Sequence, residues 1–367
     1  MIAAAATVGA DPGRVMTRRF DAISDFFDHG CDAVIDVRSP AEFAEDHVPG
    51  AIHLPVLDNE ERARVGTLYK QDSPFRARKV GAALVFRNAA AHIETALADK
   101  PGGWRPLVYC WRGGQRSGSF AWMLREIGWP ADTVAGGYRS YRRLVVKALY
   151  DASLPVRLVQ LGGHTGTAKT ALLSKLRDRG VQVLDLEALA NHRGSLLGAM
   201  PDGQPSQKAF DTRLAQAIHR FDPARPVVVE AESSKIGRLS LPKSLWDAMK
   251  AAPWIVVDAP VEARAAYLAQ AYSDVLADAK ALRQKLAPLR HFRGGPVVDR
   301  WSELISAGDN PALCKALVQD HYDPAYTKSM RVHAPDIRAQ VSIDTLAEDG
   351  QNRAADAIFD MLQTMSI

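Results

Sequence analysis

The sequence predicts an α/β protein with two parallel-sheet domains in tandem, the second of which has a helical C-terminal part. Three observations support this fold class. The chain has 367 residues, more than a single hydrophobic core usually serves. Short apolar runs alternate with helix-like stretches in both halves of the chain. A helical segment that stops before a proline separates the halves, so we place the domain boundary there.

The first domain is predicted to span residues 15–138. Short strands are expected at 33–37, 107–110 and 132–136, and a helix at 116–128 ends in a glycine that is a natural C-cap. Strands that alternate with helices in this way are typical of a parallel sheet.

A linker helix is predicted at 139–154, and the second domain at 155–367. This domain repeats the alternation before it turns mainly helical from about residue 261. Its expected strands are 156–161, 181–186, 226–232 and 254–260.

The bulk composition is that of an ordinary soluble globular protein, with 47% hydrophobic and 24% charged residues. No stretch is long and apolar enough for a membrane span, so no membrane partner is expected. Residues 1–13 lack the features of a secretory signal, and we interpret them as a frayed terminus. The net charge of +4 permits a nucleic-acid partner without requiring one.

The stretch 109-YCWRGGQRSGS-119 places a cysteine at a strand end, before two glycines and two arginines. Because a helix is expected to start just after Arg116, loop N–H groups and the positive helix end should converge on the sulfur. Such surroundings lower the pKa of a thiol and make it a nucleophile. Arg112 and Arg116 add charge for a bound anion. A buried structural role for Cys110 is the alternative, which the glycines and arginines disfavour.

The other two cysteines, Cys31 and Cys314, are interpreted as structural. The three cysteines are far apart and show no CxxC or Cys/His spacing, which argues against a disulfide framework or a zinc site. A reducing cytoplasm is therefore the expected compartment.

Upstream of the cysteine loop, 36-DVRSPAEFAEDHVPGAIHLP-55 combines a charged strand end, a Ser-Pro helix start and a Pro-Gly turn. Together these segments resemble the rhodanese family, whose cysteine carries sulfur or selenium as a persulfide-like intermediate. Five residues separate Cys110 from Arg116, one more than in common sulfurtransferases. The longer loop is closer to that of rhodanese-like phosphatases and arsenate reductases, which implies room for a larger, phosphate-bearing ligand.

The second domain opens with a strand followed by 162-GGHTGTAKTALLSKL-176, which matches the GxxxxGK[ST] pattern except that Ala168 replaces the second glycine. Loop N–H groups would surround a diphosphate, the lysine would neutralise its charge, and the last threonine permits a magnesium ion. The methyl group of Ala168 narrows this cradle, which argues against ordinary nucleotide hydrolysis. A Gly-rich turn without a ligand is the alternative. The predicted phosphate-binding residues are Gly163, Thr165, Gly166, Thr167, Lys169 and Thr170.

Two further features of this domain are candidates. The strand at 226–232 ends in Glu230 and Glu232, where P-loop proteins often place a metal-orienting carboxylate; we name Glu230, with an ordinary solvent-facing strand end as the alternative. The polar stretch 185–211 is predicted to be a long loop that holds a substrate over the phosphate site. Its candidate contacts are His192, Arg193 and Ser195.

The fusion of the two domains, with 185-DLEALANHRGS-195, 230-EAESSKIGRLSLP-242 and 320-DHYDPAYTKS-329, closely resembles the tRNA 2-selenouridine synthase family from about residue 18 to 360. The resemblance implies a two-step change of the wobble uridine in certain tRNAs. Geranyl diphosphate first alkylates the sulfur of 2-thiouridine, and selenophosphate then supplies the selenium that displaces it. The resemblance also implies a tRNA partner, a selenophosphate-supplying enzyme, a cytoplasmic location and no tightly bound cofactor.

This resemblance suggests a division of labour between the two loops. The P-loop would hold geranyl diphosphate, and Lys169 would stabilise the departing pyrophosphate. No nucleotide hydrolysis is then needed, so Ala168 is tolerated. The cysteine loop would hold selenophosphate through Arg112 and Arg116, while Cys110 takes or guides the selenium.

Family membership also predicts an RNA-binding surface, for which three groups of basic residues are candidates. Lysines and arginines supply phosphate contacts, and His291, Phe292 and Trp301, interleaved with one group, can stack on bases. Solvated helix faces are the alternative. The candidates are Lys280, Arg283, Lys285, Arg290 and Arg293; Arg139, Arg142, Arg143 and Lys147; and Arg76, Arg78 and Lys79.

Two other functions fit parts of the sequence. A rhodanese-like phosphatase or arsenate reductase fused to a nucleotide-binding domain would explain the longer cysteine loop. A small-molecule kinase with a sulfur-carrying domain would explain the P-loop, although Ala168 argues against it. The segment 321–324, His-Tyr-Asp-Pro, is open to a packing role and to substrate contact alike.

Overall fold

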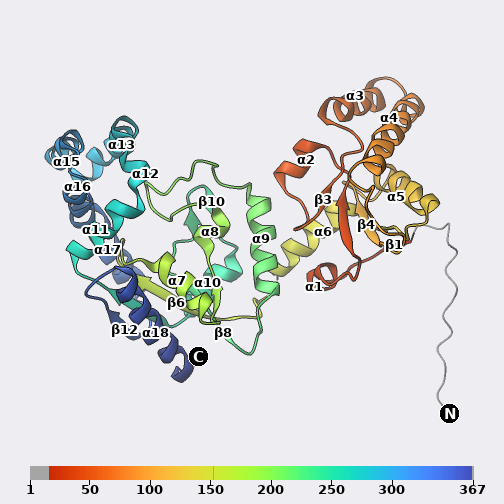
Figure 1. Cartoon of the computed structure of the whole chain (residues 1–367). Coiled ribbons are helices and arrows are strands. Elements are labelled where there is room, and N and C mark those ends of the chain that lie inside the picture. Colours follow the sequence, from red (N-terminus) through yellow and green to blue (C-terminus); the bar gives the residue numbers. More distant parts are fainter. Residues whose placement is uncertain (1–15, 152, 366–367) are drawn as a thin grey trace, which may run out of the picture. The chain divides into compact units, whose positions relative to one another are not determined.

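The computed structural model describes residues 16–151 and 153–365, which fall into two compact units (Figure 1). The first unit contains the described residues up to 151 together with Ser206–Gln216, and the second contains the rest. Residues 206–216, which we had placed in the second domain, therefore pack in the first unit. The interpretation of the N-terminal segment as frayed lies outside the described residues.

A five-stranded parallel sheet forms the centre of the first unit, in the order β1-β5-β4-β2-β3. Strand β4 is buried along its whole length, which explains why it is a continuous apolar run in the sequence. The bounds are β1 Thr17–Arg18, β2 Ala33–Asp36, β3 Ile52–His53, β4 Pro106–Tyr109 and β5 Asp132–Val134.

Helices surround this sheet and supply its core. Phe120 and Leu124 of α5 are fully buried in one cluster with Ile35 and Val108 of the strands. Helix α5 ends at Gly128, whose φ of 110° is the left-handed cap that the sequence predicts. The bounds are α1 Ile23–Phe27, α2 Pro40–Glu45, α3 Asn59–Gln71, α4 Pro74–Glu94, α5 Gln115–Ile127 and α6 Gly137–Val146, followed by a π-helical turn at Lys147–Asp151.

The second unit has its own five-stranded parallel sheet, in the order β12-β11-β6-β8-β7. Strand β6 is central, and its carboxyl end leads into the phosphate-type loop and then into α7. In sheets of this kind, ligands bind at the carboxyl ends of such strands. The bounds are β6 Arg157–Gly163, β7 Gln182–Leu184, β8 Pro226–Glu230, β11 Trp254–Asp258 and β12 Ile337–Ser342, with a separate hairpin of β9 Lys235–Ile236 and β10 Leu239–Ser240.

The helices of the second unit enclose two apolar clusters. Helices α7 and α18 pack against the sheet in one apolar cluster, and the helices after β11 enclose a second cluster around Trp301. Helix α9, Gln207–His219, belongs mostly to the first unit. The bounds of the other helices are α7 Lys169–Asp178, α8 Leu186–Ala190, α10 Lys243–Ala251, α11 Val261–Ala271, α12 Ser273–Leu276, α13 Ala279–Leu286, α14 Arg290–Arg293, α15 Gly295–Ala307, α16 Asn310–Leu317, α17 Asp323–His333 and α18 Glu348–Thr364.

The region from about residue 261 is mainly helical, as expected; a single strand, β12, lies within it and pairs in parallel with β11 at the sheet edge. Another expectation for the second domain is wrong. The stretch 185–211 is not structureless, because it contains α8, a bridge between His192 and Ala199, and the start of α9.

Candidate active sites

The Cys110 thiol lies at the carboxyl end of β4, in the loop that leads into α5. Gly113 holds this loop in shape with a φ of +64°, and a Cβ there would lie 2.5 Å from the carbonyl oxygen of Val134 in β5. Only glycine therefore fits where the loop approaches the next strand. This close approach fixes the curl of the loop around the sulfur.

Two hydrogen-bond donors and a cation surround the Cys110 sulfur. The Ser117 hydroxyl donates to Sγ at 3.2 Å, and the backbone N–H of Gly114 donates at 3.4 Å. Burial by itself raises the pKa of this thiol, but the Ser117 and Gly114 hydrogen bonds and the charge of Arg116 outweigh burial, so the pKa lies below its ordinary value. The loop therefore favours the nucleophilic thiolate.

The two arginines of the loop have different surroundings. Arg116 forms an ion pair with Glu42 of α2 at 2.7 Å and is largely buried, so its charge reaches the thiol but already has a carboxylate partner. Arg112 is exposed and lines the same cavity as Cys110. Of the pair, Arg112 is the better placed to bind an incoming anion.

The cavity around Cys110 has a volume of about 480 Å³ and is closed on one side by α3. This helix contributes Arg62 and Lys70, two cations that we did not name from the sequence. Because eight residues separate them, they lie near one face of the helix, and this shared face could have been predicted from the sequence. Nothing in the sequence indicates that this face lies over the cysteine loop.

The second candidate site is the loop between β6 and α7. Gly163 has a φ of +143°, and a Cβ there would lie 2.5 Å from the carbonyl oxygen of Val257, so the glycine is required by the neighbouring strand. The Lys169 amine folds back and donates to the carbonyl oxygens of Gly163 at 2.7 Å and His164 at 3.3 Å. These contacts hold the ammonium group at the mouth of the loop, as a diphosphate site requires.

Ala168 stands at the N-cap of α7 in the left-handed region, with a φ of 59°. Glycine is the usual residue in this conformation. The side chain is 4% exposed and belongs to the apolar cluster beneath α7. The methyl group of Ala168 therefore packs in the core, which a glycine at this position could not do.

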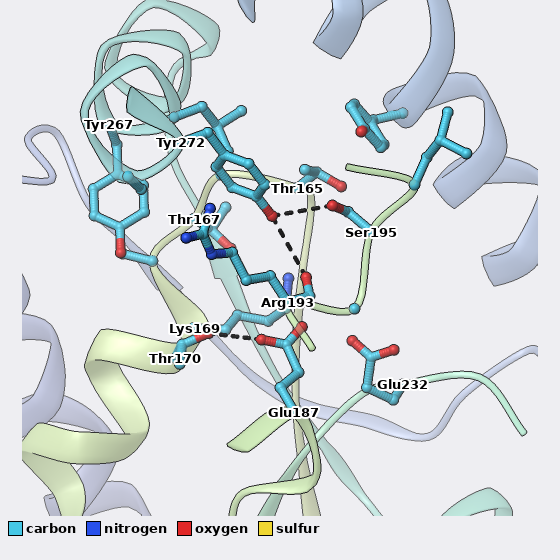
Figure 2. A pocket seen from close by; sticks show the side chains of 17 residues that line it. Thr165, Thr167, Lys169, Thr170, Glu187, Arg193, Ser195, Glu232, Tyr267 and Tyr272 are labelled. Atoms are coloured by element: carbon cyan, nitrogen blue, oxygen red, sulfur yellow. Dashed lines mark hydrogen bonds between the residues drawn. The ribbon is translucent and has the colours of Figure 1, made fainter. Parts of the chain in front are cut away.

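The P-loop borders a cavity of about 430 Å³ (Figure 2). The loop contributes the Lys169 amine and the Thr170 hydroxyl to its lining, and Arg193, Glu187 and Glu232 add further charged groups. The lining also has an apolar and aromatic part, whose side chains come from the 185–211 stretch and from α11 onward. These are Leu196, Tyr267, Leu268, Ala271, Tyr272 and Tyr322.

Three glutamates lie beside the P-loop, but they do not form a metal site. Thr170 donates to Glu187 at 3.0 Å, and the backbone N–H of Glu187 donates to the buried Glu230 at 2.7 Å. Glu187 and Glu232 line the cavity, whereas the candidate Glu230 does not. Among the residues that the structure describes, no three His, Cys, Asp or Glu side chains gather as metal ligands. The magnesium ion that Thr170 permits stays a prediction.

Burial changes the pKa values of the glutamates and of Lys169 at this loop. It raises the pKa of Glu230 well above its usual range. Burial and the neighbouring Glu187 carboxylate together raise the pKa of Glu232 to about 8. Burial lowers the pKa of Lys169, while the surrounding glutamates oppose that change. The mouth of the loop is thus less negative than three glutamates suggest.

Of the three residues named in the candidate substrate loop, two line the cavity and one does not. Arg193 pairs with Asp274 at 2.8 Å and lies over the ring of Tyr272, and the Ser195 hydroxyl lies 3.1 Å from the Tyr272 hydroxyl (Figure 2). Arg193 and Ser195 both line the cavity. His192 does not; its Nδ1 instead accepts the backbone N–H of Gly194.

Hydrogen bonds connect the His-Tyr-Asp-Pro segment and the nearby Tyr326 to the P-loop and its neighbours. Asp323 accepts two hydrogen bonds from Arg264, each at 2.8 Å, and lies 3.0 Å from His164 Nδ1. The Tyr326 hydroxyl accepts the backbone N–H of Gly163 at 3.0 Å. Asp323 and Tyr326 thus have a packing role, because they hold the loop. Tyr322 lines the cavity, and its contact with a substrate stays a prediction.

Comparisons with known proteins point to one family. The model of the tRNA 2-selenouridine synthase AAA domain matches residues 156–294, and that of the rhodanese-like domain matches residues 21–144. The tRNA 2-selenouridine synthase of Hahella chejuensis is 35% identical over 82% of this chain and 86% of its own length. That of Alcanivorax borkumensis is 33% identical over 84% and 94%, respectively. The chain belongs to the tRNA 2-selenouridine synthase family.

Membership confirms the predicted architecture, a rhodanese domain followed by a P-loop-type AAA domain with a helical C-terminal part. It also makes the protein an enzyme of the tRNA 2-selenouridine synthase type. Neither the phosphatase nor the kinase alternative gains support from these similarities. Within residues 16–151 and 153–365, no helix has the length and apolar character that crossing a membrane requires.

The basic residues predicted to contact tRNA differ in exposure. Arg139, Arg143, Lys280 and Lys285 are exposed. Several others are engaged within their own unit. These contacts are Arg142 with Asp211, Arg283 with Ser306, Arg290 with Asp299, and Arg293 with His321.

Two aromatic or basic candidates are better explained by packing. Trp301 is fully buried, and its indole N–H donates to Asp320 at 3.0 Å, so it is wrong as a base-stacking residue. The Trp301 ring faces the core, while its neighbour Arg300 in the sequence is exposed. In the sequence, this alternation looks the same as an RNA-binding surface of mixed aromatic and basic residues. Arg142 pairs with the buried Asp211 inside the first unit. Phe292, in contrast, is 74% exposed.

Proposed function

We propose that this enzyme converts 2-thiouridine at the wobble position of tRNA into 2-selenouridine through an S-geranylated intermediate. Geranyl diphosphate supplies the geranyl group, and selenophosphate supplies the selenium. The observation that carries the first step is the cavity at the P-loop, whose lining combines a phosphate-type loop with apolar and aromatic side chains. A diphosphate ester of an alkyl chain has one end for each.

In the first step, the thiocarbonyl sulfur attacks the carbon bonded to the diphosphate oxygen. The carbon–oxygen bond breaks, pyrophosphate leaves with the electron pair, and the ring loses its N3 proton to solvent, so that the alkylated base is neutral. Negative charge grows on the leaving oxygens, where Lys169 and the loop N–H groups lie to stabilise it. Leu196, Leu268 and Ala271 provide contacts for the chain. No step is routed through a metal ion.

In the second step, the selenium of selenophosphate attacks the ring carbon that carries the geranylated sulfur, and geranylthiolate leaves with the electron pair of the carbon–sulfur bond. Water then cleaves the phosphorus–selenium bond, which releases phosphate and leaves 2-selenouridine. The cavity of the first unit suits selenophosphate because Arg62, Lys70 and Arg112 offer charge for its phosphate oxygens. Cys110 lines this cavity and its thiol pKa is lowered, which supports a role for the thiolate in guiding the selenium donor. An enzyme that forms selenophosphate is then the expected supplier.

Nucleoside mass spectrometry tests this proposal directly. A tRNA that carries 2-thiouridine is incubated with the enzyme and geranyl diphosphate, with and without selenophosphate. We expect S-geranyl-2-thiouridine when selenophosphate is absent and 2-selenouridine when it is present. Unchanged tRNA under all conditions would refute the proposal and return attention to the phosphatase alternative.

A further inference from the structure

A second cavity, of about 350 Å³, lies in the second unit next to the P-loop cavity. Its walls come from the sheet, from α10 and from α17, so it is distinct from the cavity of Figure 2. Glu232 lines both cavities. Tyr326 lines the second cavity while its hydroxyl accepts the N–H of Gly163 in the P-loop. A ligand in this cavity would therefore lie beside whatever the P-loop holds.

Aromatic rings dominate the walls of this second cavity. Trp246, Trp254, Tyr326 and His333 all line it. The rings of Trp246 and His333 meet edge to face, with centroids 6.0 Å apart. Trp254 lies so close to the backbone that a Cβ on Gly162 would be 2.4 Å from its ring. The glycine before the P-loop thus makes room for this indole.

Polar groups accompany the rings. The Gln160 side chain is 3% exposed, and its Nε2 donates to the carbonyl oxygen of Met249 at 2.6 Å, which fixes the orientation of the amide. Ser233 and the exposed Lys250 also line the cavity; the Ser233 hydroxyl donates to the carbonyl oxygen of Lys235 at 2.5 Å, and the Lys250 ammonium group pairs with Asp247 at 2.9 Å. Flat surfaces for stacking, with a few fixed polar groups for the edge of a ring, are what proteins use to hold an unstacked base.

We propose that this aromatic cavity receives the wobble base of the tRNA, held out of its stack. The inference rests on the proposed function, and it assigns the base to a site of its own beside the P-loop. An alkyl chain suits the other cavity better, because Leu196, Leu268 and Ala271 lie there. The aromatic cavity instead offers ring faces on which a planar base can stack.

Binding of an anticodon stem-loop RNA tests the assignment without any turnover. The RNA with 2-thiouridine at the wobble position is compared with the same RNA lacking that one base, by fluorescence anisotropy. We expect the wild type to prefer the complete RNA by roughly tenfold, the order that one stacked base provides. Trp246→Ala should abolish this preference by weakening only the complete RNA, and Trp246→Phe should retain most of it.

Trp122→Ala is the matched control, because this tryptophan is 47% exposed in the first unit and outside the cavity. It should leave the preference unchanged. Equal binding of the two RNAs by the wild type would overturn the proposal. So would a Trp246→Ala variant that keeps the preference but loses affinity for geranyl diphosphate, which would assign the cavity to the alkyl chain. A retained preference in an enzyme that forms no selenouridine would refute the proposed function and leave this site standing.

Discussion

The Cys110 thiol is the residue whose surroundings say most about its chemistry. Burial opposes ionisation of this group, yet its pKa lies below the ordinary value because Ser117, Arg116 and loop N–H groups favour the charged form. The other two cysteines have the opposite balance. Burial raises the pKa of Cys31, and it raises that of Cys314 to about 11. Of the three thiols, Cys110 is therefore the one whose surroundings favour the reactive thiolate.

Replacing Ser117 with alanine should raise the pKa of Cys110, because it removes the hydroxyl that donates to Sγ at 3.2 Å. The thiolate fraction at a given pH then falls, so the pH profile of alkylation by iodoacetamide moves to higher pH. Mass spectrometry of the modified peptide gives the rate at each pH. Cys110→Ala supplies the background from the other thiols. A profile that does not move, or that moves to lower pH, would contradict this account of the thiolate.

Replacing Ala168 with glycine should change the free energy of unfolding by less than about 1 kcal/mol. Relief of the left-handed alanine gains roughly 1 kcal/mol. Loss of the buried methyl group costs about 0.8 kcal/mol, so the two effects nearly cancel. Denaturant unfolding measures the difference. Leu172→Ala in the same cluster is the positive control, at a cost of about 3 kcal/mol. A loss of that size for the glycine variant would show that the methyl group does more than fill space.

At the scale of elements, helix α17 begins with the carboxylate that organises the P-loop. Asp323 pairs with Arg264, whose side chain is buried and which also donates to the carbonyl oxygen of Thr165 in the loop. Sequence alone identifies Asp323 as part of a family signature. Arg264 was missed because an arginine on an ordinary amphipathic helix gives no sign that it faces inward.

Replacing Asp323 with alanine should cost about 3 kcal/mol in the free energy of unfolding, because it leaves the Arg264 charge buried without its partner. Denaturant unfolding checks this. Asp349→Ala is the control, since its ion pair with Arg353 is exposed and contributes at most about 1 kcal/mol. Equal losses for the two variants would mean that the Arg264 pair does not support the loop.

Elements with a strong local signal were predictable, and those that depend on distant partners were not. Strand β4 and helix α5 follow from an apolar run, a glycine-rich loop and a capping glycine. Strand β12 escaped prediction because most of its residues are exposed at the sheet edge, so it lacks a buried apolar pattern. The position of α3 over Cys110 depends on tertiary contacts that no local pattern encodes.

At the scale of the whole molecule, the sequence indicates two separate anion-binding loops and their chemistry, and the structure adds what surrounds each. The P-loop and the cysteine loop can be predicted from the sequence because their backbone conformations require glycine at fixed positions. The apolar part of the P-loop cavity and the aromatic cavity beside it gather residues from segments far apart in the chain. Their assembly requires the fold.

The assignment of one step to each loop is the central claim, and tRNA already carrying S-geranyl-2-thiouridine tests it most directly. Given selenophosphate, the Lys169→Ala variant should form 2-selenouridine at close to the wild-type rate, and Cys110→Ala should form little or none, as read by nucleoside mass spectrometry. On tRNA with 2-thiouridine and geranyl diphosphate, the order should reverse, with Lys169→Ala failing to geranylate. If Lys169→Ala geranylates at the normal rate, or Cys110→Ala selenates the geranylated tRNA normally, the claim is contradicted.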